Sequence, residues 1–474
     1  MSVALTTEAR GLFAALRQSA DAEAVAAIER YVGEASDRDL TRINLPSFAA
    51  RHQLDEERVI AAFLHAAHLG IFELSWNVLC PDCGGVIDAS TTLKSFDRSE
   101  YRCELCAAAY EPNLDEMIEV TFTVTRRVRR IAAHEPDELP FFEYMRQIFW
   151  ASSVDLPDDL EALAQQLTLD TLELPSGERA QLSLQLPAQF LIVFEPVTHA
   201  AHFIDVKGEP TGDRQILSPF VFNGVAAPTG TTELRPGPLR VSFENRTDRR
   251  ILPGIWIAGD ALHHLLAQRR PFLTAKRLLS NQTFRDIYRA DTIDPHQRLK
   301  ITSLTFLFTD IKGSTELYEE VGDLAAFDLV HQHFRVLTEI VAAEAGAVVK
   351  TNGDAVMATF PTPDRAVAAA LRMREAMRAL NAERGREDLL LKIGIHEGPC
   401  LAVVLNDRQD YFGQTVNIAS RVQGLAQSRA IFATTPVIAH PNTTNLLSRR
   451  GLQPVPQQRM LRGIPGEVAV YEIP

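Results

Sequence analysis

Two pairs of cysteines constrain the folding of this chain more than any other feature. Cys80 and Cys83 form one C-x-x-C pair, and Cys103 and Cys106 form a second pair about twenty residues later. Two tight turns that each offer two thiolates match tetrahedral Zn²⁺ held by four sulfurs, and Gly84 lets the first turn bend sharply. Four sulfur ligands leave no position for water. We therefore predict one structural Zn²⁺ per chain.

Length and charge narrow the class of protein. The chain has 474 residues, is 46% hydrophobic and carries a formal net charge of -13. This length predicts about three domains. A net negative chain repels the phosphate backbone, so broad binding to nucleic acid is not expected. Residues 1–16 lack the apolar core of a secretory signal, and no apolar run reaches the ~20 residues that cross a bilayer. We expect a soluble, cytoplasmic protein with no membrane partner.

The N-terminal region has helical periodicity. Residues 8–33 predict one amphipathic helix, and two short helices, Leu45–Arg51 and Asp55–His68, precede a strand at Ile71–Leu74. This order resembles a winged-helix unit. A packing module and a DNA-binding module both remain open, but the acidic start of the second short helix would face phosphates with the wrong charge.

The middle region is rich in short strand patterns, which predict a β-rich module over residues 117–260, with a sandwich as one arrangement. His199 and His202 are three residues apart in an expected turn, without a third ligand, so we interpret them as surface residues. Residues 261–299 return to helical spacing and predict a connector and linker. The clearest strand patterns are Ile118–Val124, Phe190–Pro196, Ala201–Val206 and Leu239–Glu244.

Strands and helices alternate from residue 301 onward, which predicts an α/β sandwich on a mostly antiparallel sheet. The helix over Leu324–Ala345 places Phe327 and Phe334 among its inward-facing residues. The other predicted elements are strand Leu304–Phe308, hairpin strands Ala347–Lys350 and Ala355–Phe360, helix Asp364–Glu383, strands Leu389–His396 and Cys400–Leu405, helix Thr415–Leu425 and strand Ala430–Thr434.

Two carboxylates stand at one expected edge of this sheet. Asp310 ends the first strand, and Asp354 follows the turn of the adjacent hairpin. Paired carboxylates are hard oxygen ligands that suit two Mg²⁺ or Mn²⁺ ions bound to a nucleoside triphosphate. From spacing alone, a role in capping the two turns is equally compatible.

Three longer motifs contain these carboxylates. They are Phe308–Thr315 (FTDIKGST), Lys350–Asp354 (KTNGD) and Asp410–Arg421 (DYFGQTVNIASR). Their order and spacing resemble the class III nucleotidyl cyclases, whose catalytic domain is a ferredoxin-like α/β sandwich. Asn352 and Phe412 depart slightly from the family pattern.

The resemblance implies roles for individual residues. Asp310, Asp354 and the carbonyl of Ile311 would hold two Mg²⁺ or Mn²⁺ ions per active site. Lys350 and Asp410 match the pair that reads the base. A Lys ammonium donates to N1 of adenine, which is protonated in guanine, and an Asp carboxylate accepts from the 6-amino group. Guanylyl members typically carry Glu and Cys there, so ATP is the expected substrate.

Three further residues would act on the ribose and the phosphates. Asn417 and Arg421 lie four apart on one helical face. The family pattern implies that Asn417 orients the ribose and that Arg421 stabilises transition-state charge, work that suits a planar guanidinium. Arg462 falls near the position of a phosphate-binding Lys. The expected reaction is attack of the ribose 3′-hydroxyl on the α-phosphorus, which releases cyclic AMP and pyrophosphate.

In the family each active site lies between two catalytic domains. We expect the metal ligands and Lys350 to come from one domain, and Asp410, Asn417 and Arg421 from the other. A chain with both sets intact predicts a homodimer with two equivalent sites.

The region before residue 300 resembles an uncharacterised segment found ahead of bacterial cyclase domains, on its winged-helix-like stretch, its four cysteines and the run Phe284–Tyr288 (FRDIY) before the linker. We expect it to regulate the dimer in response to an unknown ligand or protein, and a docking module that only localises the enzyme is the alternative. The resulting α+β multidomain chain divides into residues 1–78 (helical, winged-helix-like), 79–116 (zinc-ribbon-like), 117–260 (β-rich), 261–299 (helical connector and linker) and 300–474 (catalytic domain).

Other functions remain open. They are a guanylate or other nucleotidyl cyclase, a DNA-binding regulator with a nucleotide-sensing cyclase-like domain, and an inactive cyclase. A diguanylate cyclase is disfavoured, because the turn at Asn352–Val356 reads NGDAV and lacks the Gly-Gly-Asp/Glu-Glu-Phe pattern.

Overall fold

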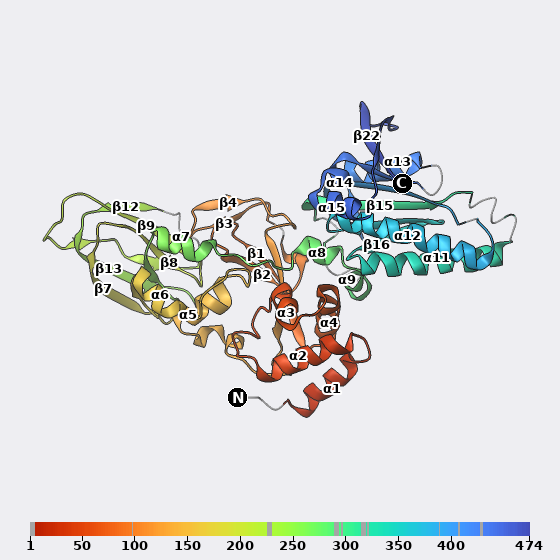
Figure 1. Cartoon of the computed structure of the whole chain (residues 1–474). Coiled ribbons are helices and arrows are strands. Elements are labelled where there is room, and N and C mark those ends of the chain that lie inside the picture. Colours follow the sequence, from red (N-terminus) through yellow and green to blue (C-terminus); the bar gives the residue numbers. More distant parts are fainter. Residues whose placement is uncertain are drawn as a thin grey trace. The chain divides into compact units, whose positions relative to one another are not determined.

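The computed structural model divides the chain into two compact units (Figure 1). The first unit comprises Met1–Thr91, Arg98–Pro112 and Glu116–Leu273, and the second comprises Thr92–Asp97, Asn113–Asp115 and Thr274–Pro474. Among the described helices, none is both long and apolar enough to span a bilayer. The structure describes residues 5–96, 98–224, 230–288, 293–294, 297–313, 319, 322–387, 389–405, 408–426 and 430–474.

The first unit begins with helices that pack on an antiparallel sheet. The predicted helix over 8–33 is two helices, because the side chain of Asp21 caps a new start by accepting from the backbone of Glu23 and Ala24. The ring of Phe63 lies 4.8 Å from that of Phe72, which joins helix to sheet. The elements are α1 (Thr7–Leu16), α2 (Ala22–Glu34), α3 (Leu45–His52), α4 (Glu56–His68) and the sheet β2-β1-β5, formed by Val86–Ser90, Phe72–Leu79 and Ile118–Val124.

The β-rich part of the first unit contains two sheets with one shared core. One has the order β12-β9-β8-β14-β6; the other has β10-β13-β11, and β7 pairs with β13. Side chains of β8 and β13 meet in the same apolar cluster. The strands are β6 (Thr168–Thr171), β7 (Arg179–Leu186), β8 (Phe190–Glu195), β9 (Ala200–Val206), β10 (Gln215–Ile216), β11 (Phe220–Phe222), β12 (Thr231–Leu234), β13 (Gly237–Asn245) and β14 (Gly254–Ile257).

The two histidines of this region are not free surface residues. The His199 ring lies against Phe149, with centroids 5.5 Å apart, and burial lowers its pKa to about 4. His202 lies in strand β9 rather than in a turn, and its ring hydrogen-bonds Thr232 at 2.9 Å. Short helices that the strand pattern did not predict cross this region: α5 (Phe141–Tyr144), a π-helical turn (Met145–Phe149) and α6 (Leu160–Leu167). Helix α7 (Asp260–Ala267) lies at the start of the region whose helical spacing was predicted from residue 261 onward.

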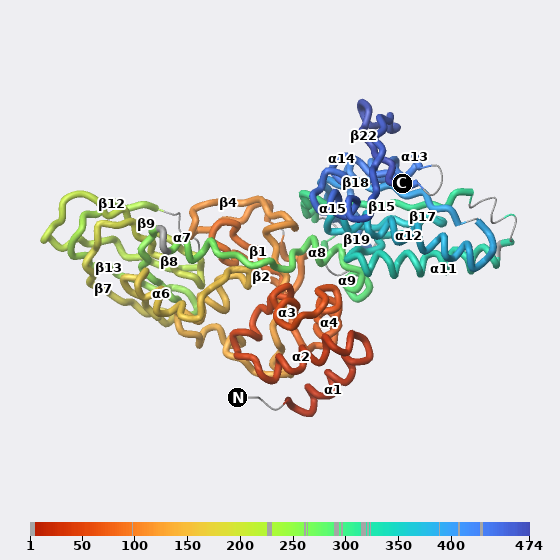
Figure 2. The backbone as a smooth tube through the Cα atoms, viewed as in Figure 1, coloured from red at the N-terminus to blue at the C-terminus, as the bar shows by residue number. Residues whose placement is uncertain are grey.

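The second unit is a sheet covered by helices on both faces (Figure 2). Its strand order is β16-β17-β15-β18-β20-β22-β21, with β19 paired to β18. Among the described strands of this sheet, only β18 and β20 pair in parallel. The strands are β15 (Leu299–Ile311), β16 (Ala347–Asn352), β17 (Ala355–Phe360), β18 (Leu391–Leu405), β19 (Arg408–Phe412), β20 (Ile431–Thr434), β21 (Val455–Met460) and β22 (Glu467–Ile473).

Helices cover the sheet from opposite sides. Ile393 and Ile395 of β18 pack into the cluster that contains α11 and α12, whereas Phe432 of β20 packs with Val422 of α13. The helices are α8 (Ala275–Leu279), α9 (Gln282–Ile287), α11 (Asp323–Ala343), α12 (Pro363–Arg384), α13 (Gln414–Leu425), α14 (Thr435–Ala439) and α15 (Pro441–Arg449).

Two details of this unit differ from the sequence prediction. The two strands expected at 389–396 and 400–405 are one continuous strand, β18, which pairs with β15 from Leu391 to Ala402. Phe327 is 65% exposed rather than inward-facing, although Phe334 packs against the core. An amphipathic period identifies an apolar face, but it does not distinguish a core from an interface.

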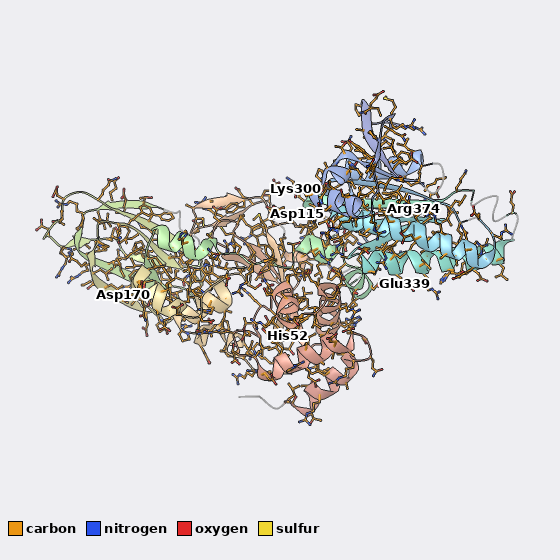
Figure 3. The ribbon with its side chains drawn as sticks, viewed as in Figure 1. His52, Asp115, Asp170, Lys300, Glu339 and Arg374 are labelled. Carbon is orange, nitrogen blue, oxygen red and sulfur yellow. The ribbon has the colours of Figure 1, made fainter. Side chains whose placement is uncertain are left out.

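A short piece from far upstream holds the start of β15. The N–H of Leu114 donates to the carbonyl of Lys300 at 3.0 Å. The carboxylate of the next residue, Asp115 (labelled in Figure 3), pairs with Lys276 at 2.9 Å and accepts from the backbone of Thr302 at 2.5 Å. Residues 113–115 therefore belong to the second unit, although they precede most of the first unit's β-rich part in sequence.

Candidate active site

The two predicted metal carboxylates lie at one edge of the sheet. Asp310 stands at the end of β15, and Asp354 follows Gly353, whose φ of 60° is the left-handed conformation that closes the β16–β17 turn. The backbone N–H of Ile311 donates to Asp354 Oδ2 at 2.8 Å, which brings the two ends together. Two half-exposed carboxylates and an adjacent carbonyl form the oxygen donor set that suits Mg²⁺ or Mn²⁺. Ser314 and Thr315 lie outside the described residues.

Lys392 is a charged neighbour that sequence reasoning missed. It pairs with Asp310 in the β15–β18 register, and its Nζ lies 3.2 Å from Asp310 Oδ2. The only available signal was the strand alternation at Leu391–Ile395, which places Lys392 on the polar face. Lys392 supplies positive charge beside a carboxylate that would hold a cation.

The predicted base-reading pair meets within one chain. Lys350 lies on β16 and Asp410 on β19, and Lys350 Nζ is 2.5 Å from Asp410 Oδ2. The other oxygen of Asp410 accepts from the N–H of Tyr411 at 2.8 Å, which fixes the carboxylate. The expectation that Lys350 and Asp410 come from opposite domains is therefore wrong, because one chain brings both to the same place.

Access differs between the two side chains. The Lys350 side chain is 52% exposed, while that of Asp410 is only 10% exposed. A held carboxylate beside a reachable ammonium can offer an acceptor and a donor to one flat ring. A cavity of about 520 Å³ adjoins the pair, and its lining residues are Val349, Lys350, Leu405, Arg408, Gln409 and Asp410.

Helix α13 presents the two residues predicted to act on ribose and phosphate. It lies directly on β18 at Gly394, where an added Cβ would stand 2.1 Å from the backbone nitrogen of Gln423. Only glycine permits that approach. Asn417 is exposed and Arg421 is half-buried one turn later. The guanidinium of Arg421 lies over Gly463, so the helix reaches the turn that carries the exposed Arg462.

The predicted site residues thus lie in three groups within the catalytic unit. The first is the metal edge with Asp310, Ile311 and Asp354, the second is the Lys350–Asp410 pair, and the third contains Asn417, Arg421 and Arg462.

Two buried histidines of the same unit stay neutral. Burial lowers the pKa of His333, on α11, to about 4, and it lowers the pKa of His396, on β18, to about 4 as well. His396 Nδ1 lies 2.7 Å from Thr434 Oγ1. Neither ring therefore adds charge to the candidate site near neutral pH.

The four cysteines converge in the first unit. All four sulfurs lie within 4.8 Å of one another, and the Cys80–Cys106 and Cys83–Cys103 sulfurs are each 3.7 Å apart. A tetrahedron with Zn–S bonds of ~2.3 Å has edges of about 3.8 Å. The N–H of Gly85 points to Cys83 Sγ at 3.4 Å, which favours a thiolate. The donor set and spacing fit Zn²⁺.

Comparison with known proteins identifies both parts of the chain. Residues 297–469 match the adenylate and guanylate cyclase catalytic domain, and residues 6–286 match a family of unknown function, DUF5939. Adenylate cyclase 2 of Rhizobium meliloti (strain 1021) is 30% identical over 203 residues, which are 40% of this chain and 53% of that protein. An adenylate cyclase of Anabaena cylindrica is 28% identical over 185 residues, 36% of each chain.

A solved cyclase structure also matches only part of this chain. The adenylyl cyclase CyaB from P. aeruginosa aligns with 38% of this chain and 96% of its own, at 26% identity and a TM-score of 0.34. The chain spans about half or less of the length of the curated relatives above. The chain belongs to the DUF5939 family, and its residues 297–469 are a class III nucleotidyl cyclase catalytic domain.

Proposed function

We propose that this protein is an adenylate cyclase that converts ATP to 3′,5′-cyclic AMP and pyrophosphate. The observation that carries the proposal is the contact between Lys350 and Asp410 beside an open cavity. Adenine offers an acceptor at N1 and a donor at its 6-amino group, which matches an ammonium and a carboxylate held side by side. Guanine offers the opposite pattern at both positions.

The proposed reaction joins two atoms of one substrate. The ribose 3′-oxygen forms a bond to the α-phosphorus, the bond from that phosphorus to the bridging oxygen of pyrophosphate breaks, and the hydroxyl proton passes to solvent. Divalent cations, when bound at Asp310, Asp354 and the Ile311 carbonyl, would supply charge neutralisation at the phosphates. Asn417 would orient the ribose, and Arg421 and Arg462 would offset phosphate charge.

We propose that the active form is a homodimer with two sites. Because Lys350 contacts Asp410, and because Asn417 and Arg421 follow Asp410 on the next helix, we assign these four residues to one chain. The metal carboxylates would come from the other chain. Exposed apolar side chains in the catalytic unit support an interface, and they include Leu324, Phe327, Leu405, Phe412, Val455 and Met460.

Mixed dimers test this division. Asp310→Ala and Lys350→Ala chains should restore activity when mixed, to about a quarter of the intact rate, because half of the dimers are mixed and each holds one intact site of two. Mixing Lys350→Ala with Asp410→Ala should restore none. Recovery by the second mixture and not by the first would contradict the assignment.

A base swap tests the choice of ATP. The double variant Lys350→Glu, Asp410→Cys should lose cyclic AMP production and gain cyclic GMP production, since both hydrogen-bonding positions are inverted or neutralised. Unchanged selectivity for ATP in a folded double variant would refute the base-reading roles.

We propose that the DUF5939 region regulates the catalytic dimer and that one structural Zn²⁺ stabilises this region through its four cysteines. We also retain a winged-helix-like assignment for residues 1–78, with a packing role, because α4 begins with Glu56 and Glu57. A truncated chain 274–474, which keeps α8 and α9, tests regulation. An unchanged rate and dimerisation constant in that chain would argue for a docking role instead.

A further inference from the structure

The last helices of the DUF5939 match fold against the catalytic sheet. Helices α8 and α9 lie within residues 6–286, yet both belong to the second unit. Tyr411 Oη donates to the carbonyl of Leu279 at 3.2 Å, and Gln282 Oε1 accepts from the N–H of Val348 at 2.8 Å. These bonds hold the two helices to β19 and β16, the strands that carry the base-reading pair.

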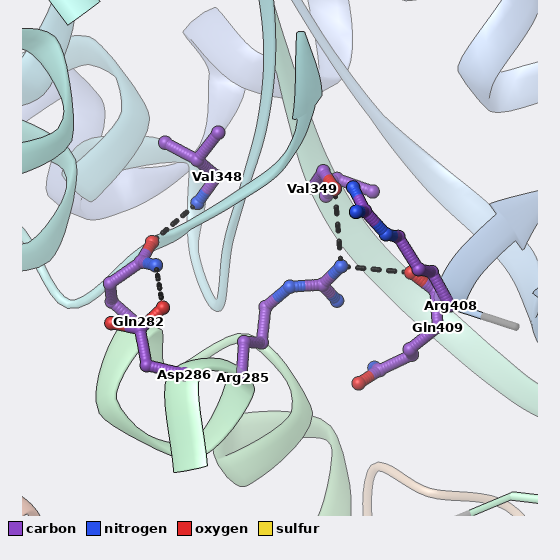
Figure 4. Close-up of a pocket in the computed structure, with 7 residues that line it drawn as sticks. All are labelled: Gln282, Arg285, Asp286, Val348, Val349, Arg408 and Gln409. Carbon is purple, nitrogen blue, oxygen red and sulfur yellow. Dashed lines mark hydrogen bonds between the residues drawn. The ribbon is translucent and has the colours of Figure 1, made fainter. Parts of the chain in front are cut away.

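Arg285 of α9 joins those two strands directly. Its Nη2 donates to the carbonyl of Gln409 at 2.8 Å and to the carbonyl of Val349 at 3.3 Å (Figure 4). Gln409 immediately precedes Asp410, and Val349 immediately precedes Lys350. One nitrogen of one side chain thus contacts the backbone next to both base-reading residues.

Apart from the Lys350–Asp410 ion pair itself, no described backbone pairing joins these two strands. β16 pairs with β17, and β19 pairs with β18, so no described ladder of backbone hydrogen bonds sets the distance between them. A guanidinium is always charged and makes strong bonds to carbonyls from a fixed plane. Arg285 therefore spaces two backbones that the sheet leaves independent.

The arrangement has an energetic cost. Arg285 Nη1 is buried with no hydrogen-bond partner among the described residues, and a buried donor left without a partner destabilises the fold. A cavity of about 270 Å³ adjoins the side chain (Figure 4), so close packing does not explain its position. A side chain held at such a cost fits a functional requirement.

We infer that Arg285 is a positioning residue that sets the separation of Lys350 and Asp410 and thereby the selectivity for the base. This inference rests on the proposed adenylate cyclase function. It also gives the DUF5939 region a direct route to substrate selection, because its last matched helix contributes the contact.

The test uses the full chain and two nucleotides that cannot cyclise, 3′-deoxy-ATP and 3′-deoxy-GTP, with binding measured by calorimetry. Arg285→Ala should bind 3′-deoxy-ATP at least tenfold more weakly and lose at least tenfold of its preference over 3′-deoxy-GTP. With ATP, KM should rise at least tenfold while kcat falls less than threefold. Arg285→Lys keeps the charge and should recover part of the affinity.

Arg277→Ala is the matched control. Arg277 lies on α8 and also donates to a carbonyl, that of Ala345 at 3.2 Å, so its loss removes a comparable bond away from the pair. Arg277→Ala should leave the affinity for 3′-deoxy-ATP and the preference over 3′-deoxy-GTP within twofold of those of the intact chain. The thermal midpoint of each variant, measured alongside, should match that of the intact chain. Equal effects of the two substitutions, or an Arg285→Ala chain within twofold in affinity and preference, would overturn the inference.

The two proposals fail differently. An intact chain that forms no cyclic nucleotide, yet prefers 3′-deoxy-ATP in an Arg285-dependent way, contradicts the proposed function only. An intact chain that forms cyclic AMP with no effect of Arg285→Ala on binding or KM contradicts the role of Arg285 only.

Discussion

Gly394→Ala should disable the catalytic domain from a position outside the proposed site. An alanine Cβ would stand 2.1 Å from the backbone nitrogen of Gln423 and 2.4 Å from its Cα. Both atoms belong to helix α13, so no flexible side chain can move aside. The helix would have to withdraw by about 1.4 Å before the closer of these contacts reaches an ordinary ~3.5 Å separation.

The magnitude follows from that displacement. Overpacking of this kind costs about 1–3 kcal/mol of stability. Asn417 and Arg421 would move with the helix, and a misplacement of about 1 Å in a catalytic group costs on the order of 100-fold in rate. We therefore expect kcat/KM for ATP to fall about 100-fold while the chain remains folded.

Initial rates of cyclic AMP formation and thermal denaturation measure the two effects. Gly424→Ala is the control, because Gly424 lies on the same helix and an added Cβ there meets nothing within 4 Å. It should keep full activity and gain up to about 1 kcal/mol from helix propensity. If the Gly394→Ala chain keeps activity within threefold of the intact protein, close contact of α13 with Gly394 does not position Asn417 and Arg421.

Three further predictions concern Arg421, the cysteine cluster and His333. Arg421→Lys keeps the charge but loses the planar fork, so kcat should fall about 100-fold with KM within threefold in steady-state kinetics; an equal rise in KM would indicate ground-state binding instead. Elemental analysis should find one Zn²⁺ per chain, and Cys83→Ser should lose it and lower the melting temperature of the first unit; a metal-free but equally stable intact chain would contradict the zinc site. Burial lowers the pKa of His333 to about 4, so between pH ~6.5 and 4 the unfolded chain binds a proton there that the folded chain does not bind. The free energy of unfolding should therefore fall by about 3 kcal/mol as the pH drops from 6.5 to 4. Urea unfolding at several pH values measures this fall, and His333→Leu should remove the part of the pH dependence that His333 causes.

Local chemistry explains what the sequence predicted well. The spacing of the C-x-x-C pairs, the Asn352-Gly353 turn and the long periodic helices α11 and α12 are set by nearby residues, and the structure contains each of them. Asp310 and Asp354 could be placed at one sheet edge for the same reason, because a short hairpin fixes where its neighbour strand ends.

Long-range pairing explains what the sequence missed. Lys350 and Asp410 meet from strands that are not neighbours in the sheet, so no pattern within either strand indicates their contact. The strand β18 continues through Gly398 and Pro399, which look like a break, because β15 supplies a partner on that stretch with a register shift. Arg285 was visible only as part of a run before the linker, and its partners lie 64 and 124 residues away.

Nucleotide turnover by the full chain is the decisive test of the proposed adenylate cyclase activity. The protein would be incubated with ATP, GTP, CTP or UTP, each with Mg²⁺ or Mn²⁺, and the products resolved by mass spectrometry. We expect 3′,5′-cyclic AMP and pyrophosphate from ATP alone, and we expect Asp354→Ala to abolish their formation. Cyclic GMP or a cyclic pyrimidine nucleotide as the main product would contradict the reading of Lys350 and Asp410, and turnover that survives Asp354→Ala would contradict the proposed metal edge.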